Sequence, residues 1–262
     1  MISSLVAKRS LILQLTKRDI LGRYRGSLLG VAWSILTPLF MLAVYTLVFG
    51  KIFQTRWKIP EQGSAGFALI LFCGLTAYNI FAETISRAPG IVVGNPNYIK
   101  KVVFPLEVLP VMILATSLVN AAIGFFIILI TNFILTGTLH WTVVYVPIVL
   151  LPLILFSLGM AWFLSALGVF VRDIVQVVPI LVTALMFLSP IFYPASALPG
   201  KLKALAVVNP IGYVVEDIRK VVLWGETPDW NWLILGLIIG SITAIFGYLW
   251  FIKTKKGFAD VI

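Results

Sequence analysis

Charged residues divide this chain into short polar stretches and long apolar ones. Five windows contain no Asp, Glu, Lys or Arg: 26–50, 62–82, 108–171, 174–200 and 231–252. A helix needs roughly 20 apolar residues to cross the roughly 30 Å of hydrocarbon in a bilayer, and the third window can hold two such helices. The pattern therefore predicts six membrane-spanning helices, near 29–53, 64–86, 107–135, 143–170, 176–193 and 230–252.

The break inside the third window falls at residues 136–141, which read TGTLHW. A glycine, two threonines and a tryptophan, a residue typical of membrane interfaces, favour a short turn there between two antiparallel helices.

Composition supports a membrane protein, since 60% of the 262 residues are hydrophobic and only 11% are charged. A soluble domain has about 25% charged residues. The net charge of +10 could indicate nucleic-acid binding, but that function needs a basic face on a soluble fold, which this composition excludes. The single cysteine, Cys73, excludes a disulfide framework. We expect an all-α integral membrane protein with one transmembrane domain over 1–262.

The basic residues of the loops predict the orientation, because Lys and Arg are retained on the cytoplasmic side. With six spans, thirteen of the 20 Lys and Arg residues lie on the face that carries both termini and seven on the other. Both termini are therefore expected in the cytoplasm. Six basic residues precede the first apolar run and no small-residue cleavage site follows it, so we expect no cleaved signal.

Two segments outside the spans carry helical patterns on the cytoplasmic side. Residues 5–22, within an N-terminal region 1–28, mix apolar and basic positions as expected for a helix in the inner membrane interface. A simple basic membrane anchor explains that pattern equally well. In the loop 90–105, Asn95 before Pro96 is typical of a helix cap and first turn. The bundle itself is expected over 29–252, with a cytoplasmic tail over 253–262.

A third helix is expected on the outer side, from Asn209 as the cap to Gly225 as the stop. Its apolar residues keep helical spacing, and Glu216 is expected to face Lys220 at i,i+4. Because this amphipathic segment follows a proline-rich turn, we expect a re-entrant helical hairpin that dips into the outer interface.

No predicted span has an ionisable residue in its core, although such residues mark most proton, ion and catalytic pathways in membranes. Glu83 and Glu107 are placed at cytoplasmic helix ends, where Glu83 can meet Arg87, and His140 lies in a short outer loop. These residues offer no evident catalytic or metal site. The pattern G-x-x-x-x-G-K-[ST] is absent from the sequence, so energy for active transport must come from another subunit.

The sequence resembles the membrane permeases of polysaccharide-exporting ABC transporters. The resemblance is carried by residues 15–38, LTKRDILGRYRGSLLGVAWSILTP, in which Arg18-Asp19, Arg23-Tyr24-Arg25, Gly30, Trp33 and Pro38 have the family's spacing. It continues in Asn95 to Lys101, Phe104-Pro105, Arg172-Asp173 and Asn209-Pro210, and so covers nearly the whole chain. That family exports lipid-linked O-antigen, capsular polysaccharide and teichoic acid, and this sequence is most similar to the O-antigen and capsule branch.

The resemblance implies a homodimer in the bacterial inner membrane that moves an undecaprenyl-linked glycan outward. Two copies of a cytoplasmic ATP-binding subunit would bind ATP and Mg, and the chain itself would need no cofactor. Its partners would be a second copy of itself, these ATP-binding subunits, the glycan and membrane lipids. Nucleic acid would not be a partner.

The resemblance also assigns candidate site residues on the cytoplasmic side. The coupling helix to the ATPase would comprise Asn95, Pro96, Asn97, Tyr98, Ile99, Lys100 and Lys101. The alternative for this segment is a solvated basic loop whose lysines meet anionic head groups. Arg172 and Asp173 would form a second cytoplasmic contact, and a positive-inside anchor explains them equally well.

The interface helix would hold Arg18, Asp19, Arg23, Tyr24 and Arg25 near the head groups and the ATPase. Arginine presents a planar fork to phosphate, so these residues are also candidates for contact with the lipid pyrophosphate. The channel lining is expected from Trp33, Thr37, Phe40, Thr183 and Phe187. Aromatic faces stack on varied sugars, although aromatic residues in spans are more often packing residues.

Other functions remain open at this point. Within the permease class, the chain could export teichoic acid, a lipid or a drug. A passive channel or scaffold would have no use for a coupling helix. An intramembrane transferase acting on lipid-linked sugars would need acid or base groups, for which Asp19, Glu83 and Glu107 are the candidates.

Overall fold

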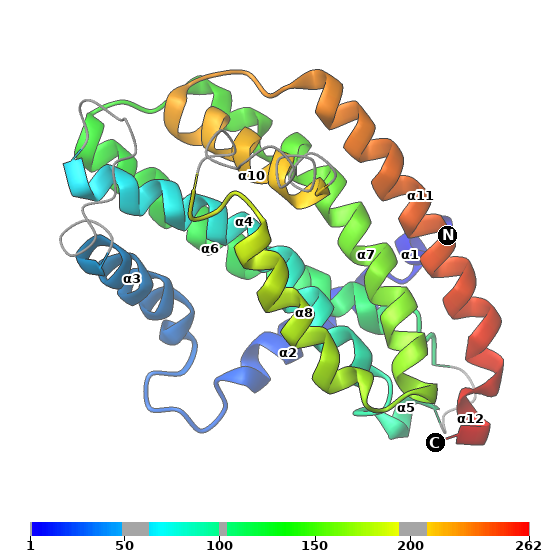
Figure 1. The fold of residues 1–262 in the computed structure, drawn as a ribbon. Helices are drawn as coiled ribbons and strands as arrows, with labels where there is room; N and C mark the ends of the chain where they lie inside the picture. Colours follow the sequence, from blue (N-terminus) through cyan, green and yellow to red (C-terminus); the bar gives the residue numbers. More distant parts are fainter. Residues whose placement is uncertain (1, 49–62, 100–103, 194–208, 262) are drawn as a thin grey trace.

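The chain folds entirely into helices in the computed structural model, which describes residues 2–48, 63–99, 104–193 and 209–261 (Figure 1). No strand occurs in these ranges. The α-helices are α1 (Ile2–Ala7), α2 (Arg9–Arg23), α3 (Trp33–Tyr45), α4 (Gly63–Ile91), α5 (Pro96–Ile99), α6 (Val108–Thr136), α7 (Val146–Phe170), α8 (Ile174–Leu188), α10 (Pro210–Arg219), α11 (Trp230–Thr254) and α12 (Phe258–Val261). Short turns of other helix types are η1 (Gly30–Ala32), η3 (Trp141–Tyr145), η5 (Lys220–Trp224) and η6 (Lys255–Gly257).

Five helical stretches in the described ranges are long and apolar enough to cross a membrane: Gly30–Val48, Gly66–Ile91, Val108–Thr136, Trp141–Phe170 and Trp230–Gly257. They confirm the all-α membrane architecture. The remaining expected span, 176–193, is the shorter apolar helix α8 of 15 residues, about 22 Å long at 1.5 Å per residue. Its helix stops at Ser189 because the following Pro190 disfavours a helical conformation in the residue before it. The expected hairpin residues 194–208 lie outside the described part of the chain.

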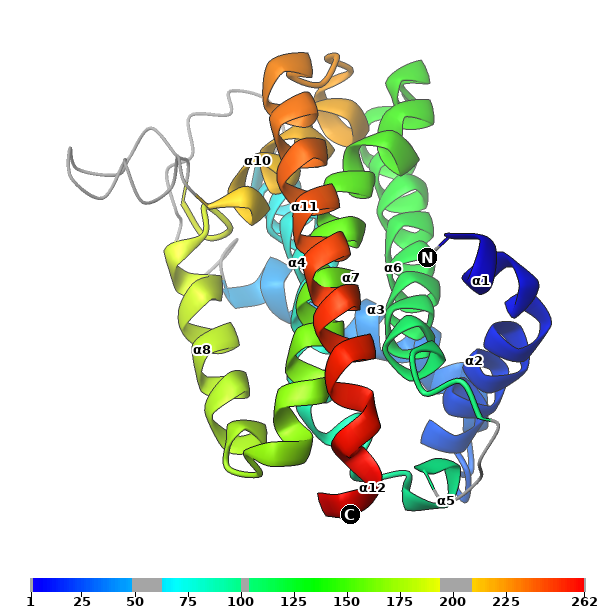
Figure 2. The same ribbon diagram turned by 90° about the vertical axis from the view of Figure 1, so that its right-hand side faces the viewer.

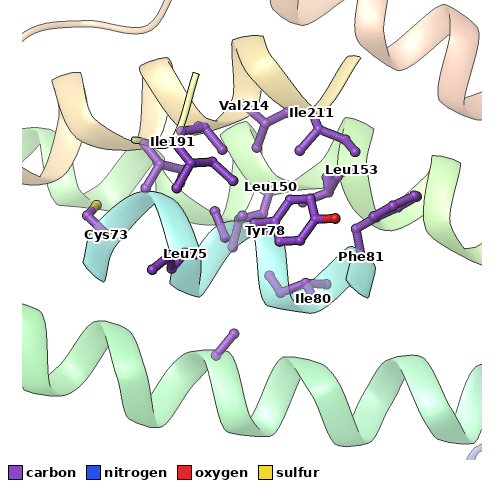
Figure 3. Close-up of a cluster of buried hydrophobic side chains, with 14 of the residues drawn as sticks. Cys73, Leu75, Tyr78, Ile80, Phe81, Leu150, Leu153, Ile191, Ile211 and Val214 are labelled. Carbon is purple, nitrogen blue, oxygen red and sulfur yellow. The ribbon is translucent and has the colours of Figure 1, made fainter. Parts of the chain in front are cut away.

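Helix α4 lies at the centre of the bundle and packs against α6, α7, α8 and α10 (Figure 1). Figure 3 shows Cys73, Tyr78 and Phe81 of α4 among side chains of α7 and α10. The Tyr78 hydroxyl donates a hydrogen bond to the Val182 carbonyl of α8. Most of the surface of α4 is apolar and buried, which accounts for its position in the interior of the bundle.

Glycines allow α7 and α11 to run side by side in close contact. A Cβ added at Gly247 would collide with the backbone carbonyl of Gly159, and one added at Gly159 would collide with Thr243. Small residues at such crossings bring membrane helices close enough for dense packing, since lipid supplies no hydrophobic driving force between helices. The same device joins α7 to α4, where Gly168 lies against the carbonyl of Pro89.

The predicted helix ends are largely confirmed. Gly137, with a φ of 70°, ends α6, and η3 then begins at Trp141. The Asn209 side chain accepts a hydrogen bond from the Ile211 N–H at 3.0 Å, and Gly225, also at φ 70°, follows η5. The predicted end of the second span near 86 is wrong, because α4 continues to Ile91.

The molecule has two distinct ends (Figure 2). We call the α5 end the one where α5 and α12 lie, with α2 crossing beside α6, and the α10 end the opposite one, where α10 lies over α4 and α7. Tryptophan and tyrosine of η3 pack at the α10 end, where the Tyr145 and Trp230 rings meet edge to face at 5.6 Å.

Candidate functional site

Four charged residues join α2 to α4 near the α5 end. The Arg87 guanidinium donates to Asp19 Oδ1 at 2.6 Å and to Glu83 Oε1 at 3.3 Å. Arg23 also donates to Glu83 Oε1, and Asn120 of α6 donates to Glu83 Oε2 at 3.0 Å. Because α4 continues past the expected end, Glu83 lies two turns inside the helix. The expectation that Glu83 marks the cytoplasmic end of the span is therefore wrong.

These contacts follow from helical spacing on both sides. Asp19 and Arg23 lie four residues apart on α2, as Glu83 and Arg87 do on α4, so each pair shares one helix face. Burial raises the pKa of the Asp19 carboxyl, but the hydrogen bond and charge of Arg87 more than offset this and hold its pKa below the usual range. The carboxylate thus stays charged and keeps α2 attached to α4.

Glu107 forms a second cluster that joins both ends of the chain to α6. Its carboxylate, almost fully buried, accepts from Lys8 between α1 and α2 and from Lys255 Nζ at 2.9 Å. Its backbone carbonyl accepts from Trp162 Nε1 at 3.0 Å. Burial raises the pKa of the Glu107 carboxyl, but the hydrogen bonds from the two lysines lower it by more than burial raises it. The pKa of Glu107 therefore lies below its usual value. Each candidate acid of a transferase is therefore a charged partner in ion pairs.

Helix α5 is a single turn whose Tyr98 ring stacks on Phe104 and contacts Arg18 of α2. The Tyr98 ring stacks on Phe104 with centroids 4.1 Å apart, and the Arg18 guanidinium carbon lies 5.7 Å from the Tyr98 centroid. The Asn95 side chain donates to the Ile91 carbonyl at 2.9 Å, so it caps the end of α4. The predicted helix start is confirmed, because α5 begins at Pro96 and the Asn95 carbonyl accepts from the Tyr98 N–H at 3.1 Å. The Asn95 side chain instead satisfies a carbonyl at the end of α4.

A cavity of about 680 Å³ lies between α2 and α4 at this end. Its charged lining residues are Arg18, Asp19, Arg23, Glu83 and Arg87. Three guanidinium groups against two carboxylates leave an excess of positive charge, and guanidinium forks match the oxygens of phosphate. We call this space the arginine cavity.

The second cavity, of about 570 Å³, lies among α3, α4 and α6. It shares Arg23 and Glu83 with the arginine cavity and extends from them along the spans. Its other polar lining residues are Tyr24, Ser34, Thr37, Tyr45, Thr76, Asn79, Ser117 and Asn120. We call it the polar cavity.

A buried arginine organises the α10 end. Arg219 is fully buried and donates to the backbone carbonyls of Pro190 at 2.8 Å and Ile191 at 2.7 Å, and to that of Ile70 at 3.2 Å. It thus joins α10 to α4 and to the chain that follows α8. Three carbonyl acceptors together with a carboxylate give the buried charge the hydrogen bonds it requires.

The carboxylate beside Arg219 is Glu216, whose Oε1 lies 3.3 Å from the guanidinium. Lys220 pairs with Asp217 at 2.8 Å. The predicted Glu216–Lys220 pair is therefore wrong: both ion pairs of α10 use the i,i+3 spacing, because the buried Arg219 draws Glu216 to its side of the helix.

A comparison with known proteins identifies the family of this chain. The family described as ABC-2 type transporter matches residues 10–223, most of the sequence. The chain belongs to the ABC-2 type transporter family. The match runs from α2 through α10 and so includes both cavities and Arg219.

Curated relatives of this ABC-2 protein carry names from polysaccharide export. An "O-antigen export system permease protein RfbA" of Myxococcus xanthus is 27% identical over 87% of this chain and 86% of its own length. One of the same name from Klebsiella pneumoniae is 25% identical over 96% and 95%. The "Polysialic acid transport protein KpsM" of Escherichia coli is 28% identical over 79% of each chain.

The structure gathers the predicted interface residues of this ABC-2 protein around the cavities. Arg18, Asp19 and Arg23 line the arginine cavity together with Asn95, and Tyr24 lines the polar cavity. Their predicted contact with a lipid pyrophosphate stays a prediction, as does that of the exposed Arg25.

Among the predicted coupling residues, Asn95 and Tyr98 are half-buried. Pro96 and Asn97 face outward on α5, whereas Lys100 and Lys101 lie outside the described residues. Arg172 and Asp173 are exposed between α7 and α8, and no ion pair between them occurs in the described ranges. Their roles stay predictions.

The predicted channel residues lie on two helices that do not pack on each other in one subunit. Helix α3 packs on α4 and α6, whereas α8 packs on α4 and α7. Trp33, Phe40, Thr183 and Phe187 are exposed, and Trp33 Nε1 donates to Ser27 Oγ at 2.9 Å. Thr37 lines the polar cavity. Whether these side chains face a channel stays a prediction.

Sequence reasoning missed two features. The burial of Arg219 was not predicted, although its spacing from Val215 and Val222 places it on the apolar face of α10. The polar residues inside α4 and α6 were missed because only ionisable groups were sought in the spans. Thr76, Asn79 and Glu83 repeat at helical spacing, and that repeat was the available signal.

Proposed function

We propose that this chain is the membrane subunit of an ATP-driven exporter that moves a lipid-linked O-antigen or capsular polysaccharide across the inner membrane. The observation that carries the proposal is the similarity over 96% of the chain to a protein named as an O-antigen export permease, within a family match over residues 10–223. The five long apolar helices support a membrane-embedded role.

Energy enters, in this proposal, through two copies of a separate ATP-binding subunit that hold ATP and Mg. The one-turn helix α5 is the coupling element that docks on this subunit. Support comes from the exposed residues Pro96 and Asn97, and from the contact of Tyr98 with Arg18, which ties α5 to α2. A displacement of α5 would thereby reach α2 and, through Asp19 and Arg23, the last third of α4.

The substrate's pyrophosphate binds in the arginine cavity. Arg18, Arg23 and Arg87 line a volume of about 680 Å³, within the usual size range of ligand sites. Arg23 and Arg87 are held by carboxylates and need no reorganisation to present their remaining N–H groups. Preorganised donors of this kind bind anions without the cost of ordering flexible side chains.

The assembly is a homodimer of six-span subunits whose termini both lie in the cytoplasm. Helix α8 is the fifth span and is shorter than the five long apolar helices, and α10 belongs to the outer re-entrant hairpin. The exposed apolar faces of α3 and α8, including Trp33, Phe40 and Phe187, line the channel where two copies meet. Exporters of teichoic acid, lipids or drugs in the same superfamily are the alternatives, and an intramembrane transferase is a less suitable one because Glu107 and Asp19 are engaged in ion pairs.

Co-purification with the ATP-binding subunit tests the coupling assignment. Replacing Asn97 and Tyr98 by alanine should release that subunit in a pull-down while the permease stays in the membrane fraction. The matched control replaces the exposed Arg9 of α2 by alanine, whereas Arg172→Ala tests the second predicted cytoplasmic contact. Retention of the subunit by the α5 variant, together with release by the Arg172 variant, would move the docking site to the α7–α8 loop.

A further inference from the structure

The polar cavity indicates which part of its substrate the proposed exporter recognises, and this inference rests on the proposed function. Three helices each present one stripe of residues, most of them polar, to this space. On α4 the stripe is Thr76, Asn79 and Glu83; on α6 it is Ser117, Asn120 and Gly124; on α3 it is Ser34, Thr37, Met41 and Tyr45. Each series repeats at steps of three and four residues, which is the spacing of a single helix face.

Such a convergence is costly inside a bilayer. A polar side chain without a partner in an apolar environment loses the hydrogen bonds it would make with water. Asn79 lies about 18 Å along α4 from Ile91 and about 24 Å from Gly63, at 1.5 Å per residue, and so near the middle of the span. It is exposed to the cavity, whereas its neighbours from Gly66 to Phe81 on this helix are buried.

Within the described residues Asn79 has no hydrogen-bond partner, although Thr76, Ser117 and Asn120 around it do. Its carboxamide offers two donors and one acceptor to whatever occupies the space. The Asn120 amide is held against Glu83, so the neighbouring donor is already fixed in orientation. This arrangement suits a ligand that carries hydroxyl and amide groups and no net charge.

The neighbouring arginine cavity shows where the charge of such a ligand would lie. The two cavities share Arg23 and Glu83, so a molecule with a phosphate among the arginines extends directly toward Asn79. The aromatic residues Tyr24, Tyr45 and Phe72 also line the polar cavity, and aromatic faces commonly pack against sugar rings. The volume of about 570 Å³ falls within the range of small-molecule sites.

We propose that the polar cavity is a binding subsite, within one subunit, for the neutral sugar residue attached to the pyrophosphate of the lipid-linked substrate, with Asn79 as its recognition residue. The subsite lies between α3, α4 and α6 and is separate from the α3 and α8 surface expected to line the channel. It would read the first sugar before the polymer moves outward.

The test compares two probes on the complete transporter, permease with ATP-binding subunit, in vesicles of phosphatidylethanolamine and phosphatidylglycerol. One probe is polyprenyl pyrophosphate, and the other is the same lipid carrying one N-acetylglucosamine. The measured quantity is the probe concentration that gives half-maximal stimulation of ATP hydrolysis. The variants are Asn79→Leu, which keeps the side-chain shape, and Thr37→Val on α3; Asn231→Leu at the exposed start of α11 is the matched control.

In the unmodified transporter the sugar-bearing probe should act at the lower concentration. Asn79→Leu should raise the half-maximal concentration of that probe roughly tenfold and leave that of the sugar-free probe unchanged, because one or two hydrogen bonds contribute about this factor. Thr37→Val should shift the same probe roughly threefold, and Asn231→Leu should shift neither.

Thermal unfolding distinguishes recognition from a structural role. Asn79→Leu removes a polar group without a partner, so the midpoint should stay or rise. A lowered midpoint, an equal shift for both probes or no shift for either would overturn the subsite. If the unmodified transporter responds to neither probe, the proposed function fails and the subsite fails with it; a normal response that Asn79→Leu does not alter removes the subsite alone.

Discussion

Arg219 offers the most direct test of how the α10 end is held together. Replacing it with methionine keeps a long side chain but removes every donor. The Pro190 and Ile191 carbonyls, which lie beyond the end of α8, then lose their guanidinium partner at buried positions. An unsatisfied buried acceptor costs about 1–3 kcal/mol, so two of them cost about 2–6 kcal/mol.

The gain on the other side is that a buried charge disappears, since methionine needs no hydrogen bonds. Glu216 remains without its partner, but its side chain is 25% exposed and can be solvated. We therefore expect a net local destabilisation of about 3 kcal/mol, the low to middle part of that range. At 1.4 kcal/mol per factor of ten, this corresponds to roughly a hundredfold change in the opening equilibrium.

The sequence supplies its own reporter for this opening, because Cys73 is the single cysteine of the chain. It is fully buried, and the next residue, Gly74, lies directly against the Arg219 guanidinium. The rate of maleimide labelling of Cys73 in intact vesicles should rise roughly a hundredfold in Arg219→Met, if opening is rapid relative to labelling. Arg9→Met, at an exposed position of α2, is the control and should leave the rate unchanged. A labelling rate in Arg219→Met within twofold of the original would refute the reasoning.

Three further predictions concern the packing and charges of the bundle. Gly247→Ala should lower the free energy of unfolding by about 1–3 kcal/mol in denaturant titrations, because its methyl group meets the backbone of α7, whereas Gly22→Ala should not, since no atom lies near its added methyl. The pKa of the Glu107 carboxylate is lowered in the folded state, so its contribution to stability is present above its ordinary pKa of 4.5 and is lost as the pH falls through the folded-state pKa. Glu107→Gln should therefore make the free energy of unfolding depend less on pH on the acid side. An unaltered pH profile would contradict the ion-pair assignment. Tyr98→Leu should reduce the amount of glycan exported per ATP hydrolysed. It should change the free energy of unfolding by no more than about 1 kcal/mol, because the Arg18–Tyr98 contact is partly exposed. A normal ratio of export to ATP hydrolysis would show that this contact does not transmit movement from α5 to α2.

The apolar windows were sufficient to predict most of the helices, because a membrane requires long uncharged segments whatever their neighbours are. Local signals at Gly137, Asn209 and Gly225 placed helix ends correctly, since capping depends on adjacent residues. The end of α4 was not predictable in this way. Its charged residues lie inside the helix only because α2 supplies partners for Glu83 and Arg87.

The residues of α2 at the candidate site were predicted, but the extension of the site into the bundle was not. The basic residues of α2 were identified from spacing and family resemblance, and the structure places Arg18, Asp19 and Arg23 around one cavity. The polar cavity forms only where three separate helices pack together, so the position of Asn79 in a cavity could not be predicted from its own helix. A lone asparagine in one apolar window gives no indication of what faces it from the other two helices.

Reconstitution measures the central claim most directly, namely that this chain exports a lipid-linked glycan only when a separate ATP-binding subunit drives it. Purified permease is inserted into vesicles alone or with that subunit, and the accumulation of a lipid-linked glycan in the far leaflet is followed with a membrane-impermeant lectin. Accumulation should require both the ATP-binding subunit and hydrolysable ATP. Accumulation against a gradient by the permease alone would contradict this claim.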